Sequence, residues 1–197
     1  DLLDWHRPKM SWRRDIQYIF QDPRGALDPV ARVFKQVRLP LDIHHAGTKA
    51  ERNLRARTVM AETQLEESLH PRKPGSLSGG QRQRATIARA LALRPKVLIC
   101  DESVSALDVS IQARVLNLLM DLRETYGIAI LFISHDLRVV HHICDEIAVL
   151  KEGVLVEKGS TETLFETPKH PYTQALLAAI PTLPSPYGVE SVGGEAG

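Results

Sequence analysis

Wholly apolar runs and amphipathic runs alternate along this chain. The runs at residues 97–100 and 128–133 have the length of strands that are buried on both faces of a parallel sheet. Between them, apolar residues recur every three or four positions, which predicts an amphipathic helix. Its apolar stripe contains Ile111, Val115, Leu118, Leu119 and Leu122. Strand, helix and strand in this order predict an α/β core built on a parallel sheet.

Three further segments extend this pattern. Residues 16–20 form a short β-type run, and Pro23 ends it because proline cannot continue a paired strand. Residues 30–69 are mostly polar and compatible with helices. Residues 147–156 are apolar on both sides of the pair Glu152-Gly153, which predicts a β-hairpin.

Another helix is predicted to begin at Ser78. Ser78 and Gln81 have the spacing of a capping box, in which the two side chains satisfy the first free backbone amides. Gly79 and Gly80 follow the cap directly, so a phosphate can approach the positive end of this helix closely. Taken alone, the same residues also fit a plain glycine-rich helix start.

Polar residues of types that serve in catalysis and ligand binding follow two of the predicted strands. Asp101 and Glu102 come directly after the run at 97–100, and His135 follows the run at 128–133. Open α/β sheets bind ligands outside the carboxyl ends of their strands. In isolation, these residues read as an exposed pair of carboxylates and a surface histidine; their order along the chain favours a site.

That order resembles the motifs of ATP-binding-cassette (ABC) ATPases. The run 77–84, LSGGQRQR, resembles the signature motif of this family, and the resemblance covers nearly the whole chain up to Ile180. It implies an α/β fold with an incomplete P-loop NTPase-like ABC ATPase core over residues 1–160. Within that domain, it implies a helical signature subdomain at about residues 24–94.

The resemblance assigns roles to residues at the sheet edge. Asp101 resembles the Walker B aspartate that holds Mg²⁺, usually through water, and Glu102 resembles the general base that polarises the attacking water. His135 resembles the switch histidine that contacts the γ-phosphate of ATP. Gln21 resembles the Q-loop glutamine, which contacts Mg²⁺ or water and senses the membrane partner.

The resemblance also implies a dimer. In the family, the signature of one subunit, here Ser78, Gly79, Gly80 and Gln81, covers ATP that is held by the other subunit. Asp108 resembles the aspartate of the D-loop, which links the two ATP sites. The implied partners are therefore a second ABC ATPase subunit, the same or different, and membrane permease subunits. The implied location is peripheral, on the cytoplasmic face of the inner (plasma) membrane.

The last part of the chain indicates one subfamily of ABC ATPases. Residues 159–165 and 168–177 resemble the extension of oligopeptide, dipeptide and nickel importer ATPases, which we place at 161–181. Some members carry a cysteine cluster for an iron–sulfur centre further on, but no cysteine follows Cys144, so we expect no iron–sulfur cluster. Residues 182–197 are rich in Pro, Gly, Ser and Glu, which predicts a disordered tail.

Composition excludes several classes of protein. Lys and Arg number 25 against 24 Asp and Glu, for a net charge of +1, so the chain lacks the basic excess of a nucleic-acid binder. No apolar run reaches the roughly 20 residues that a membrane-spanning helix needs. The two cysteines, Cys100 and Cys144, stand in predicted buried elements and lack metal-ligand spacing, which favours core thiols in a reducing compartment.

The sequence has no Gly-Lys dipeptide and therefore no Walker A loop, the phosphate-binding loop of this family. We interpret this as an N-terminal truncation, and we expect the chain alone neither to bind ATP tightly nor to hydrolyse it. The leading hypothesis is the ATPase subunit of an importer for peptides or a related small solute. The alternatives are a soluble, non-transport ABC ATPase and a non-catalytic truncated subunit that binds a partner.

Overall fold

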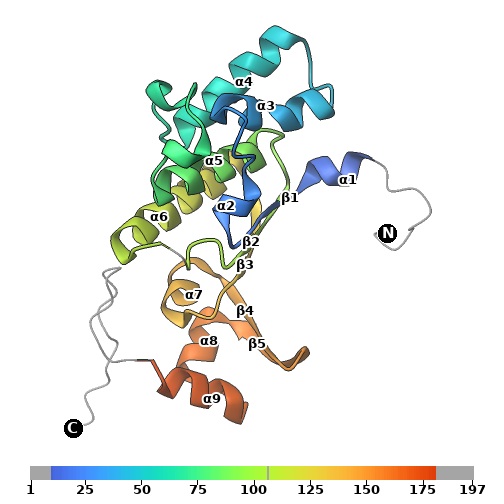
Figure 1. Cartoon of the computed structure of the whole chain (residues 1–197). Coiled ribbons are helices and arrows are strands. Elements are labelled where there is room, and N and C mark those ends of the chain that lie inside the picture. The colour runs from blue at the N-terminus through green and yellow to red at the C-terminus, as the bar shows by residue number, and fades with distance from the viewer. Residues whose placement is uncertain (1–9, 106, 181–197) are drawn as a thin grey trace. The chain divides into compact units, whose positions relative to one another are not determined.

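The computed structural model describes residues 10–105 and 107–180 (Figure 1). The chain divides into two compact units, Asp1–Ile133 and Ser134–Gly197. The predicted tail at 182–197 lies outside the described residues. No helix among those described is long and apolar enough to cross a membrane.

A parallel sheet of three strands organises the first unit. Its strands are β1 (Ile16–Ile19), β2 (Val97–Asp101) and β3 (Ala129–Ile133), paired in the order β1-β2-β3. The three strands start in register, with Val97 opposite both Ile16 and Ala129. This confirms the predicted α/β core with a parallel sheet.

Burial of the central and third strands differs from the prediction. Leu98 and Cys100 are fully buried, but their neighbour Ile99 is only half-buried. On β3, Leu131 and Ile133 are 54% and 44% exposed. The prediction that both strands are buried on two faces is therefore wrong. Successive side chains of a strand point to opposite faces, and in the described residues only one face of this sheet is well covered.

The cysteines also differ from one another. Cys100 is buried in β2, and this burial raises the pKa of its thiol to about 12. Such a thiol stays protonated and inert, as expected for a core residue. Cys144 is half-buried at the end of helix α7 (Leu137–Ile143), so the prediction of a core thiol is confirmed for Cys100 only.

Two long helices accompany the sheet. They are α5 (Gly79–Leu91), which packs against β1, and α6 (Val109–Tyr126), which packs against α5 (Figure 1). The predicted apolar stripe of α6 is buried from Val115 onward. Gly127 ends α6 with a φ of 61°, a left-handed conformation that glycine adopts without steric cost.

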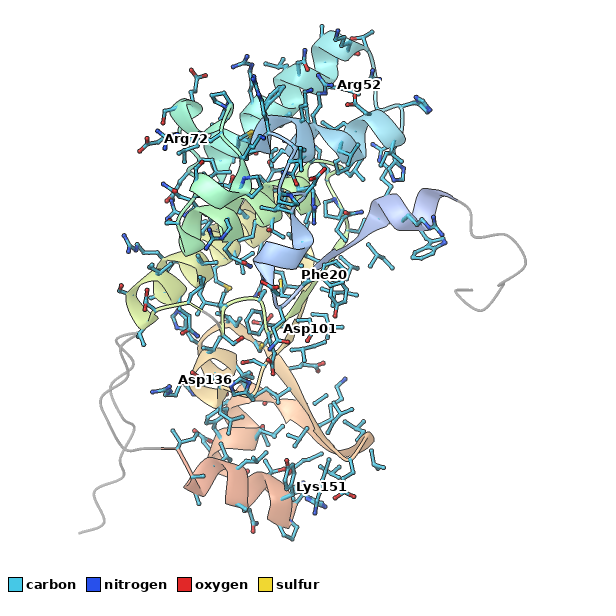
Figure 2. The ribbon with its side chains drawn as sticks, in the orientation of Figure 1. Phe20, Arg52, Arg72, Asp101, Asp136 and Lys151 are labelled. Carbon is cyan, nitrogen blue, oxygen red and sulfur yellow. The ribbon has the colours of Figure 1, made fainter. Side chains whose placement is uncertain are left out.

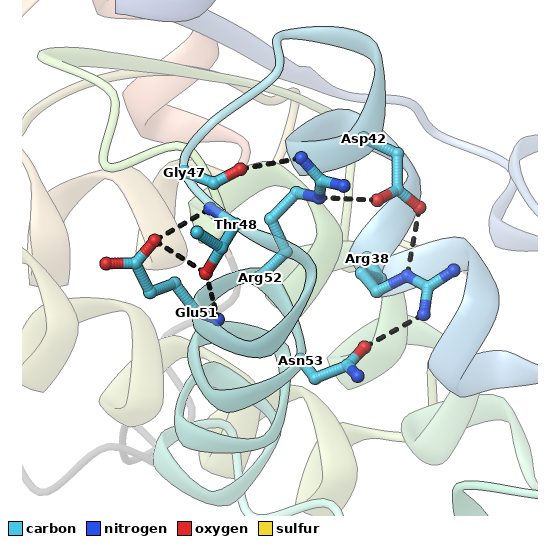
Figure 3. Close-up of polar contacts among 7 residues, drawn as sticks. All are labelled: Arg38, Asp42, Gly47, Thr48, Glu51, Arg52 and Asn53. Carbon is cyan, nitrogen blue, oxygen red and sulfur yellow. Dashed lines mark hydrogen bonds and ion pairs between the residues drawn. The ribbon is translucent and has the colours of Figure 1, made fainter.

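The segment predicted to be helical at 30–69 contains the helices α3 (Val33–Ile43) and α4 (Lys49–Glu62). Polar contacts fix the turn between them (Figure 3). Asp42 of α3 accepts a hydrogen bond from Arg38 at 2.9 Å and forms an ion pair with Arg52 of α4 at 2.8 Å. Thr48 and Glu51 form a capping box at the start of α4. These bonds hold the two helices as a hairpin.

Short helices complete the first unit. They are α1 (Met10–Asp15), α2 (Pro23–Ala26) and the 3₁₀ turns Glu67–Leu69 and Pro74–Ser76.

Arg55 connects three helices of the first unit. From α4, its guanidinium donates to the carbonyls of Leu91 at 2.9 Å and Ala92 at 3.2 Å, where α5 ends. It also donates to the hydroxyl of Tyr126, at the end of α6, over 3.1 Å. A cation at a helix C-terminus is favourable because the last carbonyls carry partial negative charge. Arg55 therefore fixes the end of α5 against α4 and α6.

The second unit contains the predicted hairpin. Strands β4 (Glu146–Lys151) and β5 (Val154–Ser160) pair antiparallel. Glu152 and Gly153 both have positive φ, as a two-residue hairpin turn of type I′ requires. Helices α7, α8 (Thr161–Glu166) and α9 (Pro171–Ala178) complete this unit. Its core consists of Val140, Ile147, Val149 and Leu164.

Glu157 of β5 holds the start of α9. Its carboxylate accepts from the backbone amides of Lys169 at 2.8 Å and His170 at 3.1 Å. His170 in turn caps the helix, because its Nδ1 accepts from the amide of Tyr172 at 3.1 Å. The Thr173 hydroxyl, and then the two backbone amides, lower the pKa of the Glu157 carboxyl. The ionised form of Glu157 is thus the one that anchors this helix.

We expect Glu157→Gln to loosen α9 at neutral pH, because a neutral amide binds the two backbone amides less strongly. A lowered folded pKa means that the contribution of Glu157 is present above its ordinary pKa of 4.5 and is lost as pH falls through the folded value. Amide hydrogen exchange should show faster exchange in residues 172–178 of the variant at pH 7, and a shrinking difference below pH 4.5. Glu152→Gln, in the exposed hairpin turn, serves as the control. It should change neither the exchange rate of residues 172–178 nor its dependence on pH. A difference that persists unchanged at low pH would contradict this account.

Candidate functional site

The carboxyl edge of the parallel sheet brings three of the predicted site residues together. Strand β1 ends just before Gln21, and β2 ends at Asp101, which Glu102 follows. The side-chain amide of Gln21 donates a hydrogen bond to the carboxylate of Glu102. Because parallel strands end at the same edge, residues 81 positions apart in the sequence become neighbours.

Asp101 has a partner that the sequence did not reveal. The hydroxyl of Tyr18, on β1, donates to the Asp101 carboxylate. This bond raises the pKa of Tyr18, with smaller contributions from desolvation and from the negative charge of Asp101. The Tyr18 ring contacts the ring of Phe20 with centroids 4.6 Å apart, and Figure 2 labels Phe20 and Asp101 at these strand ends. Tyr18 therefore orients the aspartate.

The backbone of Glu102 adopts an uncommon conformation. Its φ is 43°, in the left-handed region that costs a non-glycine residue about 1–2 kcal/mol. Its amide donates to the carbonyl of Ile133 at 2.9 Å, and its own carbonyl accepts from the Ser105 hydroxyl at 2.9 Å. These bonds hold the strained turn, and the bond from Gln21 fixes the carboxylate. Strain of this kind concentrates at functional sites.

The predicted capping box at Ser78 is confirmed. The amide of Gln81 donates to the Ser78 hydroxyl at 3.3 Å, and the amide of Ser78 donates to the Gln81 side chain at 2.9 Å. Helix α5 therefore begins at Gly79, with Ser78 as its N-cap. The side chain of Gln81 is used within the cap itself.

The two glycines of the signature differ in their surroundings. A Cβ atom on Gly80 would lie 2.8 Å from the Ile111 side chain of α6, which real contacts do not allow. A Cβ on Gly79 would lie 3.5 Å from Leu107, an ordinary contact. Gly80 is therefore needed for the close packing of α5 on α6. Close approach of a phosphate remains a prediction for both glycines, and at Gly79 packing provides no competing reason.

Asp108 lies at the start of a helix, and His135 lies in the loop that precedes one. Asp108 is the N-cap residue of α6, and its exposed side chain makes no capping bond. His135 is exposed and belongs to the second unit, directly before Asp136, which caps α7 by accepting from the amide of Arg138 at 3.0 Å. The site therefore unites Gln21, Asp101 and Glu102, and His135 remains a candidate by its place in the sequence.

The residues at the sheet edge fit a magnesium ion bound together with phosphates. Among residues 10–105 and 107–180, no three His, Cys, Asp or Glu side chains gather into a closed metal site. Mg²⁺ commonly takes one or two carboxylates and completes its shell with water and phosphate oxygens. Asp101, with Glu102 and the Gln21 amide beside it, offers this set of oxygen ligands.

Known protein families match both parts of the chain. Residues 2–105 match the family described as ABC transporter, and residues 156–196 match the one described as oligopeptide/dipeptide transporter, C-terminal region. The dipeptide transport ATP-binding protein DppF of Escherichia coli (strain K12) is 50% identical over 185 residues, which cover 93% of this chain and 55% of DppF. The chain thus spans about half the length of this curated relative.

Solved structures show the same fold. One is cbiO1 from Clostridium perfringens, part of the ABC transporter complex cbiONQ, with a TM-score of 0.72 and 31% identity over 81% of this chain and 62% of that one. Another is a dimeric post-hydrolysis state of the ATP-binding cassette MJ0796 bound to ADP and Pi. It has a TM-score of 0.66 and 34% identity over 76% of this chain and 64% of that one.

We expect Gly80→Ala to destabilise the first unit by about 1–3 kcal/mol, because the added methyl group overpacks the contact with Ile111. Gly79→Ala is the matched control and should change the free energy of unfolding by less than about 1 kcal/mol. Urea denaturation followed by tryptophan fluorescence measures this change, because Trp12 lies in helix α1 of the first unit. Equal losses in the two variants would show that packing on α6 does not distinguish the glycines.

Proposed function

This chain belongs to the ABC transporter family, and we propose that it is part of the ATP-hydrolysing subunit that energises an importer of peptides or a related small solute. Membership in the family implies ATP binding and hydrolysis. The observation that carries the proposal for the site is the bond from Gln21 to Glu102 beside Asp101, at the sheet edge where such enzymes bind nucleotide. The importer class is supported by the match of residues 156–196 to the oligopeptide/dipeptide C-terminal region.

In this proposal, residues 1–160 form the ATPase domain and 161–181 the importer-type extension. When bound, Mg²⁺ would neutralise charge that develops on the transferred phosphoryl group. Asp101 would hold the ion through water, while Tyr18 keeps its carboxylate in place. Glu102 would accept a proton from the attacking water and orient it, with Gln21 fixing the direction of the carboxylate. His135 would contact the γ-phosphate.

The signature would act on a neighbouring subunit. The capped end of α5 presents backbone amides and partial positive charge, which suit a phosphate. We propose that Ser78, Gly79 and Gly80 cover ATP held by a second ABC ATPase subunit, with Asp108 at the same interface. The dimeric cassette bound to ADP and Pi supports this arrangement. Permease subunits and a peripheral place on the cytoplasmic face of the membrane complete the proposal.

We expect the polypeptide of residues 1–197 alone to show no ATP binding at micromolar concentrations. Its sequence contains no Gly-Lys dipeptide, and the lysine and amides of a P-loop provide most phosphate contacts in this family. Isothermal titration calorimetry with ATP and Mg²⁺ measures this directly. A dissociation constant in the micromolar range would contradict the prediction.

Mixing the chain with a complete ABC ATPase subunit of a peptide importer tests the proposed role of the signature. We expect ATP turnover above that of the complete subunit alone, because the signature of this chain would complete its nucleotide site. Ser78→Arg should abolish the gain by placing bulk and a competing cation at the helix start. Ser68→Arg, an exposed serine on a 3₁₀ turn, is the control and should leave the gain intact. No gain on mixing, or a gain that survives Ser78→Arg, would refute the proposal.

A further inference from the structure

Arg89 is a half-buried cation in the last turn of the signature helix α5. Its burial lowers the pKa of the guanidinium group. Its Nη1 donates a hydrogen bond to the backbone carbonyl of Ala26, 63 residues earlier in the chain. Ala26 is the last residue of α2, which packs against α5 (Figure 1).

Partial burial of a guanidinium group is unfavourable. Even partial removal of a charge from water carries a desolvation cost, which an apolar side chain of similar length on α5 would not have. The bond to Ala26 is what the charged group adds over an apolar one. A cation in the last turn also suits the partial negative charge at the end of the helix, and its hydrogen bond in addition fixes where Ala26 lies.

Ala26 is closely tied to Gln21. Only four residues lie between them, and Asp22 makes the segment compact. The Asp22 carboxylate accepts from the amide of Gly25 at 3.2 Å, and its carbonyl accepts from the amide of Ala26 at 3.2 Å. Displacement of Ala26 would therefore displace Gln21, whose side chain holds the Glu102 carboxylate.

The contacts from Arg89 to Glu102 connect, through helix α5, with the signature residues. Ser78 lies 11 residues before Arg89 on the same helix, a distance of about 16 Å along a rigid rod. A continuous path of covalent and hydrogen bonds thus runs from Ser78 along α5 to Arg89, then through Ala26 and Gln21 to Glu102. Contiguous contacts of this kind carry coupling between sites.

We propose that Arg89 is a positioning residue, which couples the placement of the signature helix to the orientation of Glu102 through Ala26 and Gln21. A movement of α5, such as engagement of a second subunit's nucleotide by Ser78, changes the bond between Gln21 and Glu102. The reading of the two ends as nucleotide sites rests on the proposed function. The link itself is a property of this chain and is measured without nucleotide.

Arg55 provides the matched control. It also donates to backbone carbonyls of the α5 region, at Leu91 and Ala92, and it makes more hydrogen bonds than Arg89. These hydrogen bonds and its ion pair with Glu62 join α4 to the ends of α5 and α6 and not to the segment 21–26. Loss of Arg55 should therefore weaken the first unit without breaking the route to Gln21.

The test records the side-chain amide signal of Gln21 by ¹⁵N NMR of the chain, assigned by its loss in Gln21→Ala. Arg89→Met and Arg89→Lys should both shift this signal, with the smaller shift in Arg89→Lys, which retains a donor. Hydrogen exchange at the amides of Gly25 and Ala26 should become roughly tenfold faster in Arg89→Met, as expected when one stabilising hydrogen bond is lost. Arg55→Met should lower the urea midpoint and leave the Gln21 signal in place.

The reciprocal measurement follows the guanidinium signals. Coupling is mutual, so Gln21→Ala should shift the Arg89 side-chain resonances and leave those of Arg55 unchanged. An unchanged Gln21 signal in both Arg89 variants, or an equal shift in Arg55→Met, would overturn the proposal. If Arg89→Met fails to fold, Arg89→Lys and the Gln21→Ala measurement still decide. The NMR shifts of Gln21 and Arg89 could occur while mixing with a complete subunit gives no gain in ATP turnover. That result would refute the proposed function and leave the link between Arg89 and Gln21 established.

Discussion

Parallel pairing of β1, β2 and β3 is the constraint on which the candidate site depends. Because the three strands start in register and run the same way, their carboxyl ends form one edge, and the residues that follow them become neighbours. Gln21 thereby reaches Glu102, and Tyr18 reaches Asp101. A slip of one residue in the register would turn every side chain of the shifted strand to the other face and separate these pairs.

Helix α5 carries several functions in one element. Its capped start presents the signature residues, the missing side chain of Gly80 allows close packing on α6, and Arg89 near its end reaches back to Ala26. Arg55 then fixes its last carbonyls. A helix held at so many points moves as a rigid body, which is the property that coupling between its two ends requires. In the second unit, a charged side chain likewise binds the backbone at a helix end, since the Glu157 carboxylate accepts from backbone amides at the start of α9.

Local signals in the sequence predicted local structure well. The spacing of Ser78 and Gln81 predicted the capping box, and the pair Glu152-Gly153 predicted the hairpin turn. Each depends on residues within a few positions of one another, where backbone geometry leaves few choices. The exposure of Leu131 and Ile133 was not predicted, because an apolar run looks the same whether one face or both are covered. The roles assigned to Asp108 and His135 stay predictions.

The sequence by itself determined the family, the order of its motifs and the three strands that carry the candidate residues. Only the tertiary structure decided which side chains meet: Tyr18 with Asp101, Gln21 with Glu102, and Arg89 with Ala26. The physical reason is that these contacts join positions 63 to 83 residues apart. Strand register and helix packing bring such positions together, and no periodicity in a single sequence records either of them.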